Sequence, residues 1–143
     1  MVLGDLFYEA KGKIMGQRVL ETEGPQIETT VAYDGITKSG GNHVDVAHVA
    51  TFRSSQRPSN DGVFLTEGKG VITAKDGSGE MATELGRGII RFVDGGKKAV
   101  GRGSFIFSTS TIGKLSFLNN LVGGLEYEAD ETGNSTLKVW EWK

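Results

Sequence analysis

The sequence predicts an all-β protein, a closed antiparallel up-and-down barrel of about eight strands with one short helical turn. Runs of β-branched and aromatic residues alternate along the whole chain with Gly, Asn and Asp turn signals, which is typical of barrels and sandwiches. Glycine supplies 22 of the 143 residues, about twice its usual share, and the glycines lie within or between these runs. One tripeptide also recurs in three successive runs, as Gly68-Lys69-Gly70, Gly86-Arg87-Gly88 and Gly101-Arg102-Gly103.

The first half of the chain divides into strands at its turn residues. Strands are expected over residues 6–15, 17–23, 26–36 and 43–54, with an interruption at Gly12. The pair Gly24-Pro25 predicts the first turn. The third strand is expected to end at Asp34-Gly35 or just beyond this pair. Residues 39–42 form a loop, and the polar stretch 54–61 is expected to be the longest connection.

The second half continues the pattern. Strands are expected over residues 63–74, 80–93, 98–110, 122–130 and 135–142, joined by turns at 75–79, 94–97 and 131–134. The Gly-Gly pair in 94–97 fits a two-residue hairpin that needs positive φ. Residues 114–120 form the helical turn, and Leu115, Phe117 and Leu118 are expected to plug one mouth of the barrel.

The repeated tripeptide predicts the register of three strands. If the turns centre on their turn residues, Gly68 faces Gly86, Glu67 faces Arg87, and Gly88 faces Gly103. Alternation then puts the glycines on one face and the cations on the other. The favoured interpretation has the glycine face inward, filled by Phe and Ile, because Lys and Arg are almost never buried unpaired. In the alternative, Arg87 and Arg102 line a cavity and bind a carboxylate.

Composition excludes several classes of function. The net charge of −2 and the lack of long basic blocks give nucleic-acid binding no support. Without cysteine there is no disulfide, thiolate metal site or cysteine nucleophile. No apolar run reaches the ~20 residues of a membrane helix, and the first residues lack the features of a secretory leader. We therefore expect a cytoplasmic protein with no membrane partner, no metal and no cofactor.

Histidine and glutamate residues supply the candidates for acid–base chemistry. His43 and His48 lie on opposite faces of one strand and cannot chelate one metal from it, whereas His43 and Asp45 share a face. A solvated strand-edge histidine is the favoured interpretation of that pair. Glu126 and Glu128 share a face in the last hairpin.

That hairpin also carries Trp140 and Trp142 on one face. A carboxylate buried beside tryptophan acquires a raised pKa suited to acid–base catalysis. The favoured interpretation is an edge hairpin, with tryptophan closing one end of the barrel and the glutamates in water.

The Gly-x-Gly strands, the acidic turns and the closing segments resemble small barrels of the allene-oxide-cyclase-like kind, which include uncharacterised bacterial proteins. The segments that carry the resemblance are Gly113-Lys114-Leu115, Asn119-Asn120 and Glu126-Tyr127-Glu128, within residues 60–142. The resemblance implies a closed antiparallel barrel, often oligomeric, with an apolar pocket at one end. It carries over no catalytic residue, and fold alone does not decide function.

Three functions stay open at this point. The first is a barrel that binds a small apolar or amphipathic molecule, or one that bears a carboxylate, through Arg87, Arg102, Phe105, Phe107, Trp140 and Trp142. The second is a cyclase or isomerase in which Glu126 or Glu128 moves a proton. The third is a structural homo-oligomer with a solid core. The volume and lining of the interior distinguish the three.

Overall fold

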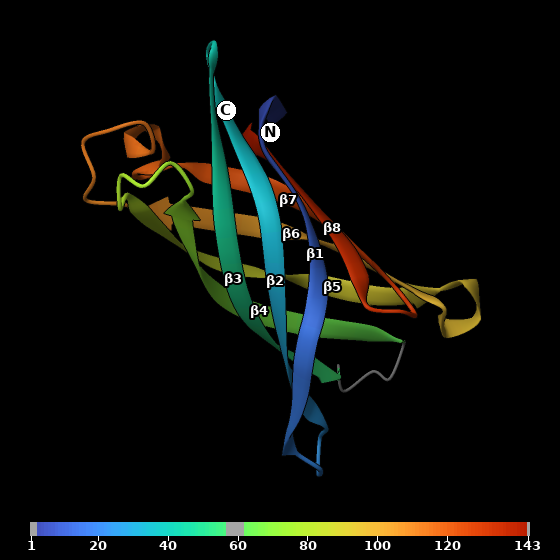
Figure 1. Ribbon diagram of the computed structural model, residues 1–143. Coiled ribbons are helices and arrows are strands. Elements are labelled where there is room, and N and C mark those ends of the chain that lie inside the picture. The colour runs from blue at the N-terminus through green and yellow to red at the C-terminus, as the bar shows by residue number, and fades with distance from the viewer. Residues whose placement is uncertain (1–2, 57–61, 143) are drawn as a thin grey trace.

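A computed structural model describes residues 3–56 and 62–142, and its eight strands form a closed antiparallel barrel in chain order (Figure 1). The strands are β1 (Leu3–Glu21), β2 (Gln26–Ser39), β3 (Asn42–Gln56), β4 (Val63–Ala74), β5 (Met81–Val93), β6 (Lys98–Ser108), β7 (Val122–Asp130) and β8 (Asn134–Trp142). Helical structure in these residues is limited to two 3-10 turns, η1 (Asp94–Gly96) and η2 (Ser116–Leu118). The predicted fold class is confirmed.

The register predicted from the tripeptide is confirmed at each pair. Gly68 faces Gly86 and Glu67 faces Arg87 across β4 and β5, and Gly88 faces Gly103 across β5 and β6. The glycines face the interior and the cations face outward. Large and small residues alternate on the inner wall, so that glycines on one strand make room for rings on the next.

Two glycines that looked like interruptions lie inside continuous strands. The first two predicted runs form the single strand β1, and β2 continues past Asp34-Gly35 to Ser39. A Cβ on Gly12 would lie 2.5 Å from the Tyr33 ring, and one on Gly35 would lie 2.5 Å from the Tyr8 ring. These glycines therefore make room for two interior tyrosines, and they do not turn the chain.

The hairpin between β5 and β6 also differs from the prediction. Its centre is correct, but the chain forms η1 and returns through three residues with positive φ, Asp94, Gly95 and Gly96. The connection therefore takes four residues, 94–97, between the paired Val93 and Lys98. The predicted long connection over residues 54–61 lies mostly outside the described residues.

The segment between β6 and β7 closes one end of the barrel, as predicted. Leu115 and Leu118 are fully buried, and Phe117 packs on the core, with its ring centroid 6.3 Å from that of Phe7. Asn119 accepts a hydrogen bond from the Thr109 amide at 3.2 Å. This plug leaves the opposite end of the barrel as the way into the interior.

The Glu80 carboxylate, just before β5, holds the plug. It accepts hydrogen bonds from the Thr111 hydroxyl at 2.5 Å and from the amides of Leu115 at 3.1 Å and Lys114 at 3.2 Å. The hydrogen bond from Thr111, followed by that from Leu115, lowers the pKa of Glu80. All of these donors favour the ionised carboxylate.

Acid should therefore loosen the plug. Because the folded-state pKa of Glu80 is depressed, its stabilising contribution is complete above the ordinary value of 4.5 and is lost as the pH falls through the lower folded value. We expect Glu80→Gln to be less stable than the wild type at pH 7, with the difference shrinking by pH 3. Urea unfolding of both proteins at the two pH values measures this. A difference that does not change with pH would contradict the assignment.

Candidate functional site

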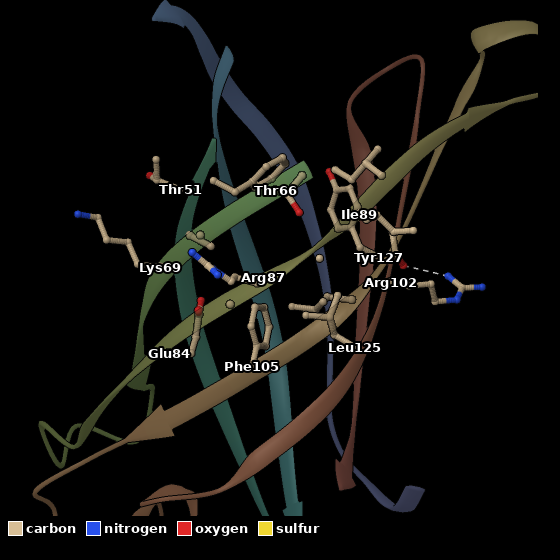
Figure 2. Close-up of a pocket in the computed structure, with 18 of the residues that line it drawn as sticks. Thr51, Thr66, Lys69, Glu84, Arg87, Ile89, Arg102, Phe105, Leu125 and Tyr127 are labelled. Carbon is tan, nitrogen blue, oxygen red and sulfur yellow. Dashed lines mark hydrogen bonds between the residues drawn. The ribbon is translucent and has the colours of Figure 1, made fainter. Parts of the chain in front are cut away.

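The barrel interior is not solid. A cavity of about 70 Å³ lies between β3, β4, β5, β6 and β7 (Figure 2). Its wall is mostly apolar or glycine, with Phe52, Gly86, Ile90, Phe105 and Leu125 among the lining residues. Glu84 is the carboxylate on the inner wall, and it lies between Ala82 and Gly86 on the inward face of β5.

A larger pocket of about 250 Å³ forms the mouth of the barrel at the end away from the plug. Phe52, Ile90 and Tyr127 line both spaces, so the two adjoin. The mouth adds Phe64 and Phe92, whose rings meet edge to face at a centroid distance of 5.6 Å. The result is an apolar funnel that leads toward a buried carboxylate.

A chain of hydrogen bonds crosses the interior from β1 through β3 to β5. The Tyr8 hydroxyl lies 2.8 Å from His48 Nδ1, and His48 Nε2 lies 2.8 Å from Glu84 Oε1. The three side chains are at most 2 % exposed. The Tyr33 ring stacks on His48 with a centroid distance of 5.2 Å. Both imidazole nitrogens are thus occupied.

The second carboxylate oxygen of Glu84, Oε2, has no hydrogen-bond partner. Among the described residues, Glu84 Oε2 and Ser135 Oγ are the buried side-chain atoms without a hydrogen bond. When Tyr8 donates to Nδ1, the neutral imidazole carries its proton on Nε2 and donates it to Glu84. Glu84 Oε2 is then an acceptor without a donor, in a residue that lines the cavity. Such an atom is costly to leave unsatisfied, so it favours a ligand that donates a hydrogen bond.

Tyrosine hydroxyls supply a second polar group in the same interior. Tyr33 and Tyr127 line the cavity with Glu84, and the Ser135 hydroxyl lies beside both phenols without a hydrogen bond of good geometry. Burial raises the pKa of Tyr127 to about 12, and burial followed by the Tyr127 charge raises that of Tyr33. Burial, with a smaller effect of Glu84, also raises the pKa of Tyr8. All three phenols therefore stay protonated near neutral pH.

Gly70 on β4 lets the histidine and the glutamate meet. A Cβ there would lie 2.7 Å from His48 Nε2 and closer still to Glu84 Oε1. The first tripeptide of the repeat therefore has a function in the site that is different from the one predicted: its second glycine leaves the room that the hydrogen-bonded pair occupies.

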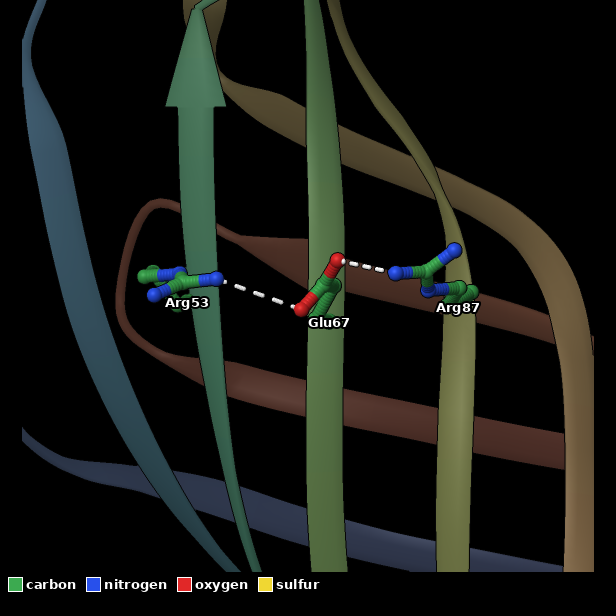
Figure 3. Close-up of polar contacts among 3 residues, drawn as sticks. All are labelled: Arg53, Glu67 and Arg87. Atoms are coloured by element: carbon green, nitrogen blue, oxygen red, sulfur yellow. Dashed lines mark hydrogen bonds and ion pairs between the residues drawn. The ribbon is translucent and has the colours of Figure 1, made fainter.

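The cations of the tripeptide lie on the outer wall. Arg87 donates to Glu67 at 2.7 Å, and Arg53 donates to the other oxygen of Glu67 at 3.2 Å (Figure 3). Arg102 lies 3.9 Å from Glu126, and its side chain points away from the cavity (Figure 2). The interpretation that places the cations outside is confirmed. Arg87 and Arg102 are among the residues that line the cavity, although both are exposed. Ligand binding by either residue stays a prediction.

The aromatic candidates lie in different places. Phe105 lines the cavity, whereas Phe107 is fully buried and lines neither space. Trp140 is half-buried and Trp142 is 48 % exposed at the end of β8. The structure thus brings only Phe105 of these four residues to the cavity.

The carboxylate candidates lie outside the barrel. Glu126 is near Arg102, and Glu128 forms an ion pair with Lys98 at 3.3 Å. His43 and Asp45 are exposed. A catalytic role for Glu126 or Glu128 stays a prediction, and neither residue is among those that line the cavity.

Sequence reasoning missed His48 and Glu84 as a pair. The sequence contains a signal for Glu84. The inward face predicted for β5 begins at Gly86, and Glu84, two positions earlier, lies on the same face. His48 likewise lies on the same face of β3 as Val44, Val46 and Ala50. A charged residue in line with an inward glycine face indicates a buried carboxylate.

The described residues contain no group of three or more His, Cys, Asp or Glu side chains that could hold a metal ion. Within the same described residues, no helix is long and apolar enough to cross a membrane.

Comparisons with known proteins show the fold alone. No family model and no curated protein matches the chain. A crystal structure of a protein of unknown function from Clostridium acetobutylicum ATCC 824 is similar, with a TM-score of 0.75, 14% identity, and coverage of 97% of this chain and 98% of that one. A conserved protein of unknown function from Rhodopseudomonas palustris is similar with a TM-score of 0.71 at 13% identity, over 99% and 97% of the chains. Both neighbours are uncharacterised, and neither supports an allene-oxide-cyclase relationship in particular.

Proposed function

We propose that the barrel binds a small amphipathic molecule in its interior, with the apolar part in the mouth and a hydrogen-bond donor directed at Glu84. One observation carries the proposal: Glu84, whose Oε2 has no hydrogen-bond partner, lines a cavity that adjoins a wider apolar mouth. Ligand sites of this kind are apolar with a few polar groups that fix orientation.

The volumes indicate the size of the ligand. A cavity of about 150 Å³ holds benzene, so the mouth of about 250 Å³ has room for one or two rings. The inner cavity of about 70 Å³ has room for a short polar extension. Phe105 and Leu125 on the inner wall would contact that extension. A solid structural core, the third function considered, lacks this space.

A suitable probe is 2-phenylethanol, a single ring with a hydroxyl group on a two-carbon stem. Titration followed by ¹H–¹⁵N spectra should move the amide signals of Gly86 and Gly101 at the cavity. The turn glycines Gly40 and Gly77 should not move. Propylbenzene, which replaces the hydroxyl by a methyl group, should bind more weakly, because it leaves Glu84 Oε2 unsatisfied.

A matched pair of variants places the site. Ala99 lines the mouth, whereas Ala47 is exposed on the outer wall of β3. Ala99→Trp fills the mouth, so we expect it to weaken 2-phenylethanol binding at least tenfold, while Ala47→Trp leaves it unchanged. Equal effects of the two variants would contradict an interior site. So would a wild-type protein whose Gly86 and Gly101 signals do not respond at millimolar probe.

A further inference from the structure

We propose that Glu84 is a general base that removes a proton from the carbon next to a carbonyl group in a small, largely apolar ketone. The proposal rests on the proposed function, since the ketone would occupy the same funnel. It adds a reaction to binding and assigns it to a residue that the sequence did not single out.

Geometry selects Glu84 over His48 as the group that touches the substrate. His48 is fully buried, both of its nitrogens are within 2.8 Å of a partner, and the Tyr33 ring covers one face. Glu84 Oε2 has no hydrogen-bond partner, and Glu84 is among the residues that line the cavity where a substrate would lie. His48 holds Glu84 in place through Oε1, which leaves Oε2 free to accept a proton.

The surrounding wall suits proton transfer from carbon. Gly86, Ile90 and Phe105 offer no hydrogen-bond donor side chain that would compete for Glu84 Oε2. A base held beside an apolar wall meets the substrate with little intervening water, and such positioning contributes to general-base catalysis.

The substrate class follows from what shares the cavity with the base. Removal of a proton beside a carbonyl group places negative charge on the carbonyl oxygen, which needs a hydrogen-bond donor. Tyr33 and Tyr127 line the same cavity as protonated phenols. The interior therefore offers an acceptor for the proton and donors for the oxygen.

The step balances without a further reagent. The Glu84 carboxylate forms an O–H bond with the α-proton, and the C–H electron pair forms the C=C bond of an enolate as the carbonyl π pair moves to oxygen. The reverse step returns a proton from the Glu84 carboxyl to the same carbon, or to a conjugated one. In D₂O, exchange of the Glu84 proton with solvent between turnovers leaves deuterium on the carbon.

The test follows this exchange with 2-indanone, a bicyclic ketone with acidic α-hydrogens. Loss of its CH₂ signal in D₂O, recorded by ¹H NMR, should be faster with the wild-type protein than in buffer. Glu84→Gln keeps the shape of the side chain but removes the base, so the protein-dependent rate should fall about 100-fold or to the buffer rate. Glu67→Gln makes the same change on the outer wall and should leave the rate unchanged.

A competition experiment covers the case in which Glu84→Gln does not fold. Saturating 2-phenylethanol should suppress the exchange catalysed by the wild-type protein, because both molecules need the funnel. If 2-phenylethanol binds but the wild type leaves exchange at the buffer rate, the general-base proposal is overturned and the binding function stands. Exchange that persists in Glu84→Gln, or under saturating 2-phenylethanol, overturns it as well. Failure of 2-phenylethanol to bind overturns the binding function itself.

Discussion

Phe107→Ala is expected to lower the free energy of unfolding by about 3–5 kcal/mol, the usual effect of emptying a buried aromatic position. Phe107 is fully buried, and its ring meets those of Phe7 and Phe105 edge to face at centroid distances of 5.4 and 5.7 Å. These contacts join β1 and β6 beneath the plug. Urea unfolding of the purified variant measures the loss.

Phe92→Ala is the matched control for this experiment. Phe92 is 55 % exposed at the mouth, so the same deletion should lower the free energy of unfolding by less than about 1.5 kcal/mol. Equal losses in the two variants would contradict the placement of Phe107 in the core. A large loss for Phe107→Ala would show that Phe107 supports the barrel. Phe105, by contrast, lines the cavity.

Gly103→Ala is expected to destabilise the barrel by about 3 kcal/mol, at the upper end of the range for overpacking. A Cβ at Gly103 would lie 2.8 Å from Gly88 Cα and closer still to the Arg87 carbonyl oxygen. Both obstacles are backbone atoms of β5, so no side-chain rotation relieves the clash and the two strands must separate.

Gly16→Ala tests whether the effect comes from this close approach or from the loss of a strand glycine in general. Gly16 lies in β1, where an added Cβ meets no atom within 4 Å. That variant should be as stable as the wild type or more stable by up to about 1 kcal/mol, because alanine reduces the freedom of the unfolded chain. Chemical unfolding of both variants decides the matter, and similar destabilisation would contradict the argument.

The barrel itself could be predicted because its cause is local. Alternation along a strand and the position of a turn together fix which residues face each other, and this was enough to pair Glu67 with Arg87 and Gly88 with Gly103. Where prediction erred, at Gly12 and Gly35, the glycines serve rings that arrive from a neighbouring strand. Local turn propensity contains no information about such a ring.

The candidate site was harder to predict for a related reason. His48 and Glu84 are 36 positions apart in the chain and lie on strands that do not pair with each other. They meet only because β4 between them carries Gly70, which has no side chain to fill the interior at that level. The exposed pair Glu126 and Glu128 was a candidate because it shares the predicted last hairpin with Trp140 and Trp142, and a shared hairpin does not decide which residues are buried.

The tripeptide repeat shows where the two kinds of information divide. The sequence by itself determined the strand class, the register and the outward direction of Lys69, Arg87 and Arg102, because each depends on alternation and on the free energy of burying a charge. Only the tertiary structure decided that the barrel keeps a cavity and that Glu84, with one unpartnered oxygen, lines it. Closing a sheet brings together inner faces from strands far apart in the chain, and the space left between them depends on all of those side chains at once.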